Sequence, residues 1–215
     1  MGLQWIFDLL LAYPNFLYLL TLRVLAATLV ILAPASSLAP TSVAIMFFST
    51  IAIAARWRGS FNGGSDSMTL IVLLTTSVAL IFPALTLGCL WYLALQTCSS
   101  YFISGVVKIR SANWRSGSAL KSFLNSTVYG SSSTWNALTN RAFICRTLSW
   151  SIIAFECSFP LALSNPGVCL CYIAGAMLFH IVNVYIFGLN RFLFAWTAAY
   201  PALIYCSASA LQANV

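Results

Sequence analysis

The stretch TLGCLWYLALQTCSSYFISGVVK, residues 86–108, decides the fold class of this 215-residue chain. It carries no charged side chain before Lys108, and about 20 mostly apolar residues are enough for a helix to cross a bilayer. Comparable runs lie at 16–34, 38–55, 67–85, 145–163, 167–187 and 192–210. The pattern predicts an all-α fold: a polytopic integral membrane helical bundle of about seven transmembrane helices, within a range of about six to eight.

The composition supports a membrane protein over a soluble one. Hydrophobic residues make up 61% of the chain and charged residues only 6%, whereas about 25% of the residues in a soluble domain are charged. The net charge of +7 comes from ten Lys/Arg against three Asp/Glu. These basic residues fall mainly in short connections between apolar runs, which is typical of membrane topology, so we expect the lipid bilayer as partner and no nucleic acid.

The seven cysteines are scattered through the apolar runs. Cys169 and Cys171 form a C-x-C pair, but no His, Asp or Glu stands beside them. No zinc-type spacing occurs, and free cysteine behaves as a small hydrophobic residue. We therefore predict structural packing for the cysteines and no metal site.

Basic residues also predict the orientation of the chain. Arg56 and Arg58 follow the second run, a basic group from Lys108 to Arg141 follows the fourth, and Arg191 follows the sixth. These connections share one side of the membrane, and the positive-inside rule assigns that side to the cytoplasm. We expect a cytoplasmic N-terminus, an external C-terminus and a multi-pass protein of the cell membrane, most simply a bacterial inner membrane.

A single membrane domain is predicted over 1–215. Within it, 1–14 is an interfacial segment in which 2–12 forms a short helix that Tyr13-Pro14 ends. The segment 109–144 is a polar, basic loop, and WRSGSALKSFL (114–124) inside it has the composition of a helix on the membrane surface. Pro83 either kinks or separates the third and fourth runs.

Four ionisable side chains are predicted at membrane depth: Arg23, Lys108, Glu156 and His180. Such groups cost about 2.5–3.5 kcal/mol each on insertion scales, and they often mark functional sites. Arg23 and Glu156 have a structural reading as well, because Arg23 can form an ion pair with Glu156 or Asp66. His180 is either a packing residue or a catalytic one, with Asn183 three residues further on the same helix face.

Lys108 has two readings of its own. As an anchor, its apolar stem would lie in lipid while the ammonium reaches the membrane surface. As a general base, the amine would sit in a nonpolar pocket and take a proton from a substrate. Tyr101, Gly105 and Lys108 share a helix face, and Gly105 allows another backbone or a ligand to approach.

A second polar stretch, RWRGSFNGGSDSMT, occupies 56–69. Ser65 and Asp66 follow paired glycines there. Backbone amides in such a turn can bind a small polar ligand. A helix N-cap formed by Ser65 or Asp66 explains the same residues equally well.

Taken together, three stretches resemble a known family. YFISGVVKIRSANW (101–114), FECSFPLAL (155–163) and FHIVNVYIFGLNRFLFAWTAAYPAL (179–203) are similar, in order and spacing, to the membrane domain of vitamin K-dependent gamma-carboxylases. That domain is the horizontally transferred transmembrane (HTTM) domain. The resemblance extends from about residue 18 to 205. The carboxylases carry a further histidine before the third span, where this chain reads NGGSD.

The resemblance implies roles for individual residues. Lys108 takes the position of the base that deprotonates the vitamin K hydroquinone, and His180 and Asn183 match the family's Phe-His-x-x-Asn positions. Glu156, Asp66, Ser65 and Arg23 are supporting or substrate-binding candidates. A quinone or quinol is the cofactor that the resemblance implies.

Three functions follow as hypotheses. The first is an accessory or maturation subunit of a membrane system, as in stand-alone HTTM proteins that resemble the membrane component of the sporulation-delaying toxin system. Its protein partner would dock on 109–144. The alternative is a membrane-embedded enzyme in which Lys108 acts as general base on a lipophilic quinol-like substrate. A transporter is a remote third, because no inverted repeat is visible.

Overall fold

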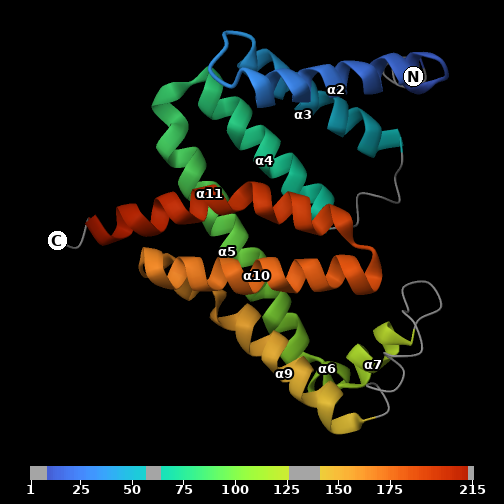
Figure 1. The fold of residues 1–215 in the computed structure, drawn as a ribbon, viewed down its shortest axis with the longest axis vertical. Coiled ribbons are helices and arrows are strands. Elements are labelled where there is room, and N and C mark those ends of the chain that lie inside the picture. The colour runs from blue at the N-terminus through green and yellow to red at the C-terminus, as the bar shows by residue number, and fades with distance from the viewer. Residues whose placement is uncertain (1–8, 57–63, 126–140, 213–215) are drawn as a thin grey trace. The chain divides into compact units, whose positions relative to one another are not determined.

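The computed structural model describes residues 9–56, 64–125 and 141–212, and within these ranges it is helical and contains no strand (Figure 1). The chain divides into two compact units, 1–90 and 91–215. Each unit is described separately below. The predicted all-α class is therefore confirmed, while the prediction of a single domain over the whole chain stays a prediction.

The first unit is a set of helices that pack in chain order. α2 (Asn15–Leu32) contacts α3 (Ala39–Arg56), and α3 contacts α4 (Gly64–Ile81). A short 3₁₀ helix, η2 (Pro83–Leu85), follows α4. Pro83 therefore separates the third and fourth apolar runs, because its ring nitrogen has no hydrogen to continue the helical bonding. α5 (Thr86–Arg110) begins at the end of this unit.

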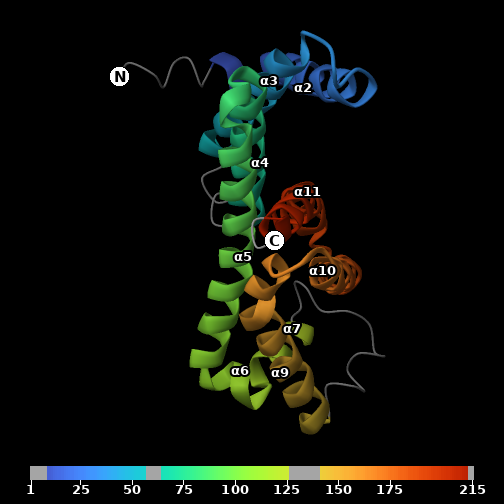
Figure 2. The same cartoon turned by 90° about the vertical axis from the view of Figure 1, so that its left-hand side faces the viewer.

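The second unit holds the remaining helices. α5 continues into it and is followed by α6 (Ala112–Ser116), α7 (Ser118–Leu124), α9 (Ala142–Ser158), the 3₁₀ helix η3 (Phe159–Leu163), α10 (Pro166–Phe187) and α11 (Asn190–Gln212). α10 and α11 lie side by side and run in opposite directions (Figures 1 and 2). Asn165 caps α10 by accepting a hydrogen bond from the Val168 amide at 2.9 Å, and Gly188 ends that helix with a φ of 67°.

The long helices coincide with the apolar runs predicted from sequence. Five of the described helices are long and apolar enough to cross a membrane: Asn15–Leu32, Gly64–Ile81, Ala142–Leu163 with its 3₁₀ end, Pro166–Phe187 and Asn190–Ala210. A shorter apolar helix covers Ala39–Ala55. α5, which covers the predicted run at 86–107, is not among these candidate spans. A polytopic helical membrane protein is confirmed, and its orientation in the membrane stays a prediction.

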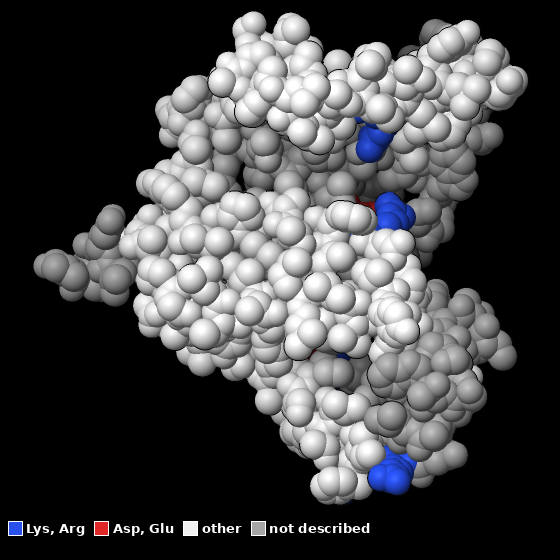
Figure 3. Space-filling model, in the orientation of Figure 1, with Lys and Arg blue, Asp and Glu red and all other residues white. Residues whose placement is uncertain are grey.

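The exposed surface has the character expected of helices that face lipid. Large apolar side chains on α2, α10 and α11 are widely exposed, among them Ile31 at 77%, Tyr185 at 81% and Phe194 at 72%. On the face shown in Figure 3, coloured charged side chains are few. In a bilayer this surface contacts acyl chains, so its exposure does not indicate a binding site.

Two predictions about the connecting segments need correction. The segment 109–144 is not simply a loop, because α6, α7 and the start of α9 fall within it. The surface helix predicted over 114–124 is broken at Gly117, which adopts a φ of 83°, a conformation that glycine tolerates and a continuing helix does not. Of the predicted interfacial helix 2–12, residues 1–8 lie outside the described residues, and 9–11 are helical.

Candidate functional site

A buried ion pair joins α5 to α9. The Lys108 ammonium donates to the Glu156 carboxylate, with Nζ 2.8 Å from Oε1 and 2.7 Å from Oε2. It also donates to Ser104 Oγ at 2.5 Å, and that hydroxyl donates to Glu156 Oε1 at 3.2 Å. The Trp114 ring lies on another side of the ammonium, with Nζ 5.1 Å from the ring centroid. The side chains of Lys108 and Glu156 are only 15% and 4% exposed, so the amine turns inward and does not act as a surface anchor.

Local sequence explains why these groups meet. Ser104 precedes Lys108 by four residues, which places both on one face of α5. Gly105, between them, lets α9 come into backbone contact: a Cβ at this position would lie 2.7 Å from Cys157 Sγ and 2.8 Å from Cys157 N. Glu156 is the neighbour of Cys157 in sequence, so this close approach delivers its carboxylate to the ammonium.

A second buried polar cluster lies at Tyr101, closer to the N-terminal end of α5 than Lys108. The Tyr101 hydroxyl is 2.6 Å from His180 Nε2 and 3.0 Å from the Tyr200 hydroxyl, which connects α5 with α10 and α11. All three side chains are buried. The Tyr101 ring stacks on Phe159 with a centroid distance of 3.9 Å. His180 Nδ1 has no hydrogen-bond partner among the described residues.

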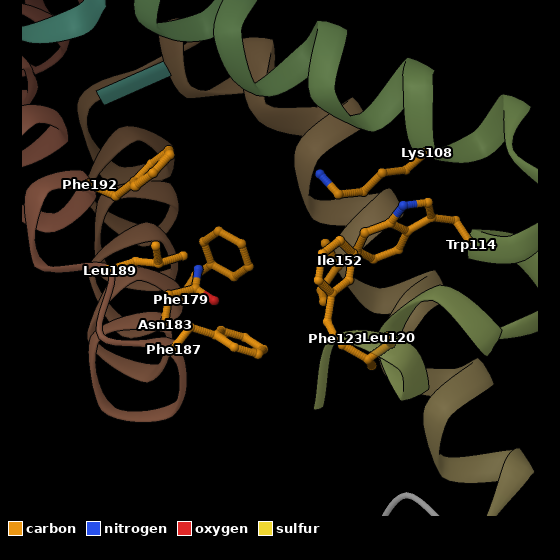
Figure 4. Close-up of a pocket in the computed structure, with 10 residues that line it drawn as sticks. All are labelled: Lys108, Trp114, Leu120, Phe123, Ile152, Phe179, Asn183, Phe187, Leu189 and Phe192. Atoms are coloured by element: carbon orange, nitrogen blue, oxygen red, sulfur yellow. The ribbon is translucent and has the colours of Figure 1, made fainter. Parts of the chain in front are cut away.

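A cavity of about 350 Å³ lies against the ion pair. Figure 4 shows Lys108 and Trp114 on one wall, with the lysine nitrogen directed toward the opposite wall, where Asn183 and several aromatic rings are placed. Its lining is Lys108, Trp114, Leu120, Phe123, Ile152, Phe179, Asn183, Phe187, Leu189 and Phe192. The only polar side chains in this lining are therefore an ammonium and an amide on facing walls and the indole of Trp114.

The cavity brings together some of the predicted site residues. Lys108 and Asn183 both line it. His180 is not among its lining residues. Its ring lies next to the rings of Phe179 and Phe192, at centroid distances of 5.4 and 6.5 Å, and both of those rings do line the cavity. The imidazole is thus separated from the cavity by aromatic side chains.

The other predicted candidates belong to the first unit. Arg23 Nη1 donates to the Met46 carbonyl, Ser49 Oγ and Thr50 Oγ1 at 3.1, 2.7 and 2.7 Å. These acceptors belong to α3, which follows α2 in the chain and packs against it. The predicted ion pair of Arg23 with Glu156 or Asp66 stays a prediction.

Ser65 and Asp66 lie in the first turn of α4 and are both 5% exposed. An acidic residue in a first turn is favourable because the amide end of the helix is positive. The two readings of these residues, a helix N-cap and a turn that binds a small polar ligand, both stay predictions. The rest of the predicted glycine turn, 57–63, lies outside the described residues.

The sequence reasoning did not single out Ser104, Trp114 or Tyr200. The spacing of four between Ser104 and Lys108 was a usable signal. Tyr200 carried none, because it is 99 residues from Tyr101 and only the tertiary fold brings the hydroxyls together. Among the described residues no group of three His, Cys, Asp or Glu side chains is arranged to hold a metal ion.

A model of the HTTM domain matches residues 83–209. This chain belongs to the HTTM domain family. The matched range contains both polar clusters and all the residues that line the cavity. No curated protein and no solved structure matched the chain, so the geometry of this HTTM domain has to be interpreted from its own residues.

The hydroxyl of Tyr101 is expected to hold the second cluster together. In Tyr101→Phe, His180 Nε2 and the Tyr200 hydroxyl lose a shared partner while they remain buried. Leaving a buried polar group unsatisfied costs about 1–3 kcal/mol. We expect the free energy of unfolding in mild detergent to fall by about that amount.

Tyr172→Phe is the matched control for this variant. The Tyr172 ring packs in the same aromatic group, 5.5 Å from Phe159, but no hydrogen bond of its hydroxyl occurs among the described residues. Its loss should therefore change stability by less than about 0.5 kcal/mol. Equal effects of the two substitutions would mean that the hydrogen bonds of Tyr101 contribute nothing beyond ring packing.

Proposed function

We propose that this HTTM domain binds a lipophilic, ring-containing quinol-like molecule in its cavity and takes a proton from it. The observation that carries the proposal is the placement of Lys108, whose ammonium lines an otherwise aromatic and aliphatic cavity while Glu156 pairs with it. Binding pockets for small molecules typically combine an apolar lining with a few placed polar groups. Asn183 on the facing wall supplies a second such group.

The ion pair gives the proton a place to go. An ammonium cannot accept a proton, so Lys108 first passes one of its own to the Glu156 carboxylate, 2.7 Å away. The neutral amine then takes the hydroxyl proton of the bound molecule and becomes an ammonium again. The proton ends on Glu156, the electron pair of the broken O–H bond stays on the substrate oxygen, and the Lys108 charge stabilises that anion.

The resemblance to the vitamin K-dependent carboxylases supports this assignment of Lys108. We do not extend it to glutamate carboxylation, because the stretch NGGSD replaces the family's further histidine before the third span. The substrate class is therefore proposed from the cavity itself: a flat ring for the aromatic walls, and oxygen atoms for Lys108 and Asn183.

Menadione provides a direct binding probe. Quinones quench tryptophan fluorescence on contact, and Trp114 lines the cavity, so the difference between the wild type and Trp114→Phe isolates the signal from this site. Removing a hydrogen bond from a charged group costs about 1.5–3 kcal/mol. We expect Lys108→Ala to raise the dissociation constant of menadione roughly tenfold to a hundredfold.

Lys121→Ala is the matched control, because Lys121 is the other lysine of the chain and does not line the cavity. Lys108→Arg separates binding from proton transfer, since arginine keeps the positive charge but cannot act as a base near neutral pH. Wild-type protein should accelerate the air oxidation of menadiol, which proceeds through its anion, and Lys108→Arg should not. Equal acceleration by both proteins would refute the proposed role of Lys108.

The accessory role predicted from sequence is the second candidate. One observation favours it: the Lys108 ammonium is already surrounded by Glu156, Ser104 and Trp114, as in an ion pair that only joins two helices. A stoichiometric protein partner that co-purifies with wild type and with Lys108→Arg alike, together with no quenching by menadione, would favour this candidate over the enzyme.

A further inference from the structure

Five exposed basic side chains gather at one end of the second unit. They lie on the last residue of α5, on α6 and α7, and at the start of α9: Arg110, Arg115, Lys121, Arg141 and Arg146. We call this group the basic face. α6 and α7 both pack against α9, and both views of the fold place these helices together with the end of α5 (Figures 1 and 2).

No exposed acidic side chain of the second unit compensates this charge. Glu156 is the only Asp or Glu between residues 91 and 215, and it is buried in the pair with Lys108. The five side chains therefore make a positive surface without a carboxylate partner in their own unit. Such a surface attracts an anion from outside the protein.

α7, beneath the basic face, is amphipathic. Leu120 and Leu124 of α7 are buried in a cluster with Ile186, and Phe187 packs against it. Gly117, between α6 and α7, holds them against α9, since a Cβ there would lie 2.6 Å from the Arg146 backbone nitrogen. Short helices with an apolar inner side and a basic outer side lie at the level of lipid headgroups.

We propose that the basic face binds the headgroups of anionic phospholipids in the leaflet that it meets. The chain is a multi-pass membrane protein, so headgroups border this end of the unit, and each nearby Lys or Arg adds roughly a fivefold preference for an anionic membrane. This inference is independent of what the cavity binds.

Hydrogen exchange in nanodiscs tests the proposal with the intact chain. Wild-type protein is placed in discs of phosphatidylcholine alone and in discs with added phosphatidylglycerol, and amide exchange is followed over 111–125. We expect exchange there to slow roughly tenfold or more in the anionic discs, and the slowing to shrink as salt is added, because exposed charges are screened.

Two triple variants identify the responsible charges. Arg110→Gln with Arg115→Gln and Lys121→Gln removes three of the five charges and should strongly reduce the difference between the two kinds of disc. Arg110→Lys with Arg115→Lys and Lys121→Arg keeps every charge and should preserve it. The proposal is wrong if wild type exchanges equally in both discs, or if the neutralised variant responds as wild type does. It is also wrong if only a co-purifying protein, and no lipid, protects this segment.

Discussion

Lys108→Met is expected to destabilise the protein by about 3–5 kcal/mol, because it leaves a buried charge without its partner. Glu156 is 3% exposed, and its remaining partner would be the hydroxyl of Ser104. Few single substitutions cost this much in a protein of marginal stability. The measurement is the free energy of unfolding by denaturant titration in mixed micelles.

The paired substitution should behave in the opposite way. Replacing a buried ion pair with apolar side chains of similar volume is often neutral, or stabilising by about 1–4 kcal/mol. We therefore expect Lys108→Met with Glu156→Leu to recover the stability that Lys108→Met alone loses. Lys121→Met, at an exposed lysine, should change stability by less than about 0.5 kcal/mol. Glu156→Leu alone is measured as well. If the double variant loses as much stability as Lys108→Met and Glu156→Leu lose together, no ion pair forms.

The paired variant also separates the two proposed functions. It should fold with the α5–α9 contact intact and with no titratable group beside the cavity. If the cavity is a quinol site, menadione binding is weakened in this variant although the protein is stable. If the pair only joins helices, the variant keeps the biological activity of the wild type.

Gly105→Ala is expected to be the second most damaging change. The added methyl group would lie 2.7 Å from Cys157 Sγ and 2.8 Å from Cys157 N, and a backbone atom cannot rotate away as a flexible side chain can. Overpacking of this kind typically costs about 1–3 kcal/mol. Because the same contact brings Glu156 to Lys108, the substitution should also weaken menadione binding.

Gly88→Ala in the same helix is the control, and its effect should have the opposite sign. Nothing lies within 4 Å of a Cβ at that position, and alanine is favoured over glycine in a helix by about 1 kcal/mol. We expect Gly88→Ala to be stabilising by up to that amount in the same unfolding titration. Similar losses in both variants would mean that the contact at Gly105 is looser than described.

Most of the long helices could be predicted from the sequence, because a helix that crosses a bilayer needs a long apolar run. Such runs are visible in a single sequence without any alignment. Lys108 and Glu156 were also found, since charged groups stand out in such runs. The pairing of Lys108 with Glu156 was not predicted, because 48 residues separate them in the sequence. Glu156 was instead considered as an ion-pair partner of Arg23. Arg23 donates to a serine and a threonine of the adjacent helix α3.

The aromatic cavity and the Tyr200 contact lay beyond sequence reasoning for a different reason. Phe and Tyr are frequent in this chain, with 15 and nine copies, so no single one carries a signal. The break at Gly117 was also missed, because a helical pattern can tolerate an isolated glycine. In the folded protein Gly117 adopts a φ of 83° and lies against the α9 backbone.

The chain of contacts from His180 through Tyr101 to Tyr200 has a direction. A hydroxyl carries one hydrogen, so if Tyr101 gives its hydrogen to Nε2, Tyr200 must donate to Tyr101. The neutral imidazole then carries its hydrogen on Nδ1. If Nε2 holds the hydrogen, it donates to the Tyr101 oxygen, the Tyr101 hydrogen becomes available to Tyr200, and Nδ1 becomes an acceptor. A molecule that hydrogen-bonds to Nδ1, which has no partner among the described residues, therefore selects the tautomer and, through it, whether the Tyr101 hydroxyl donates to His180 or accepts from it.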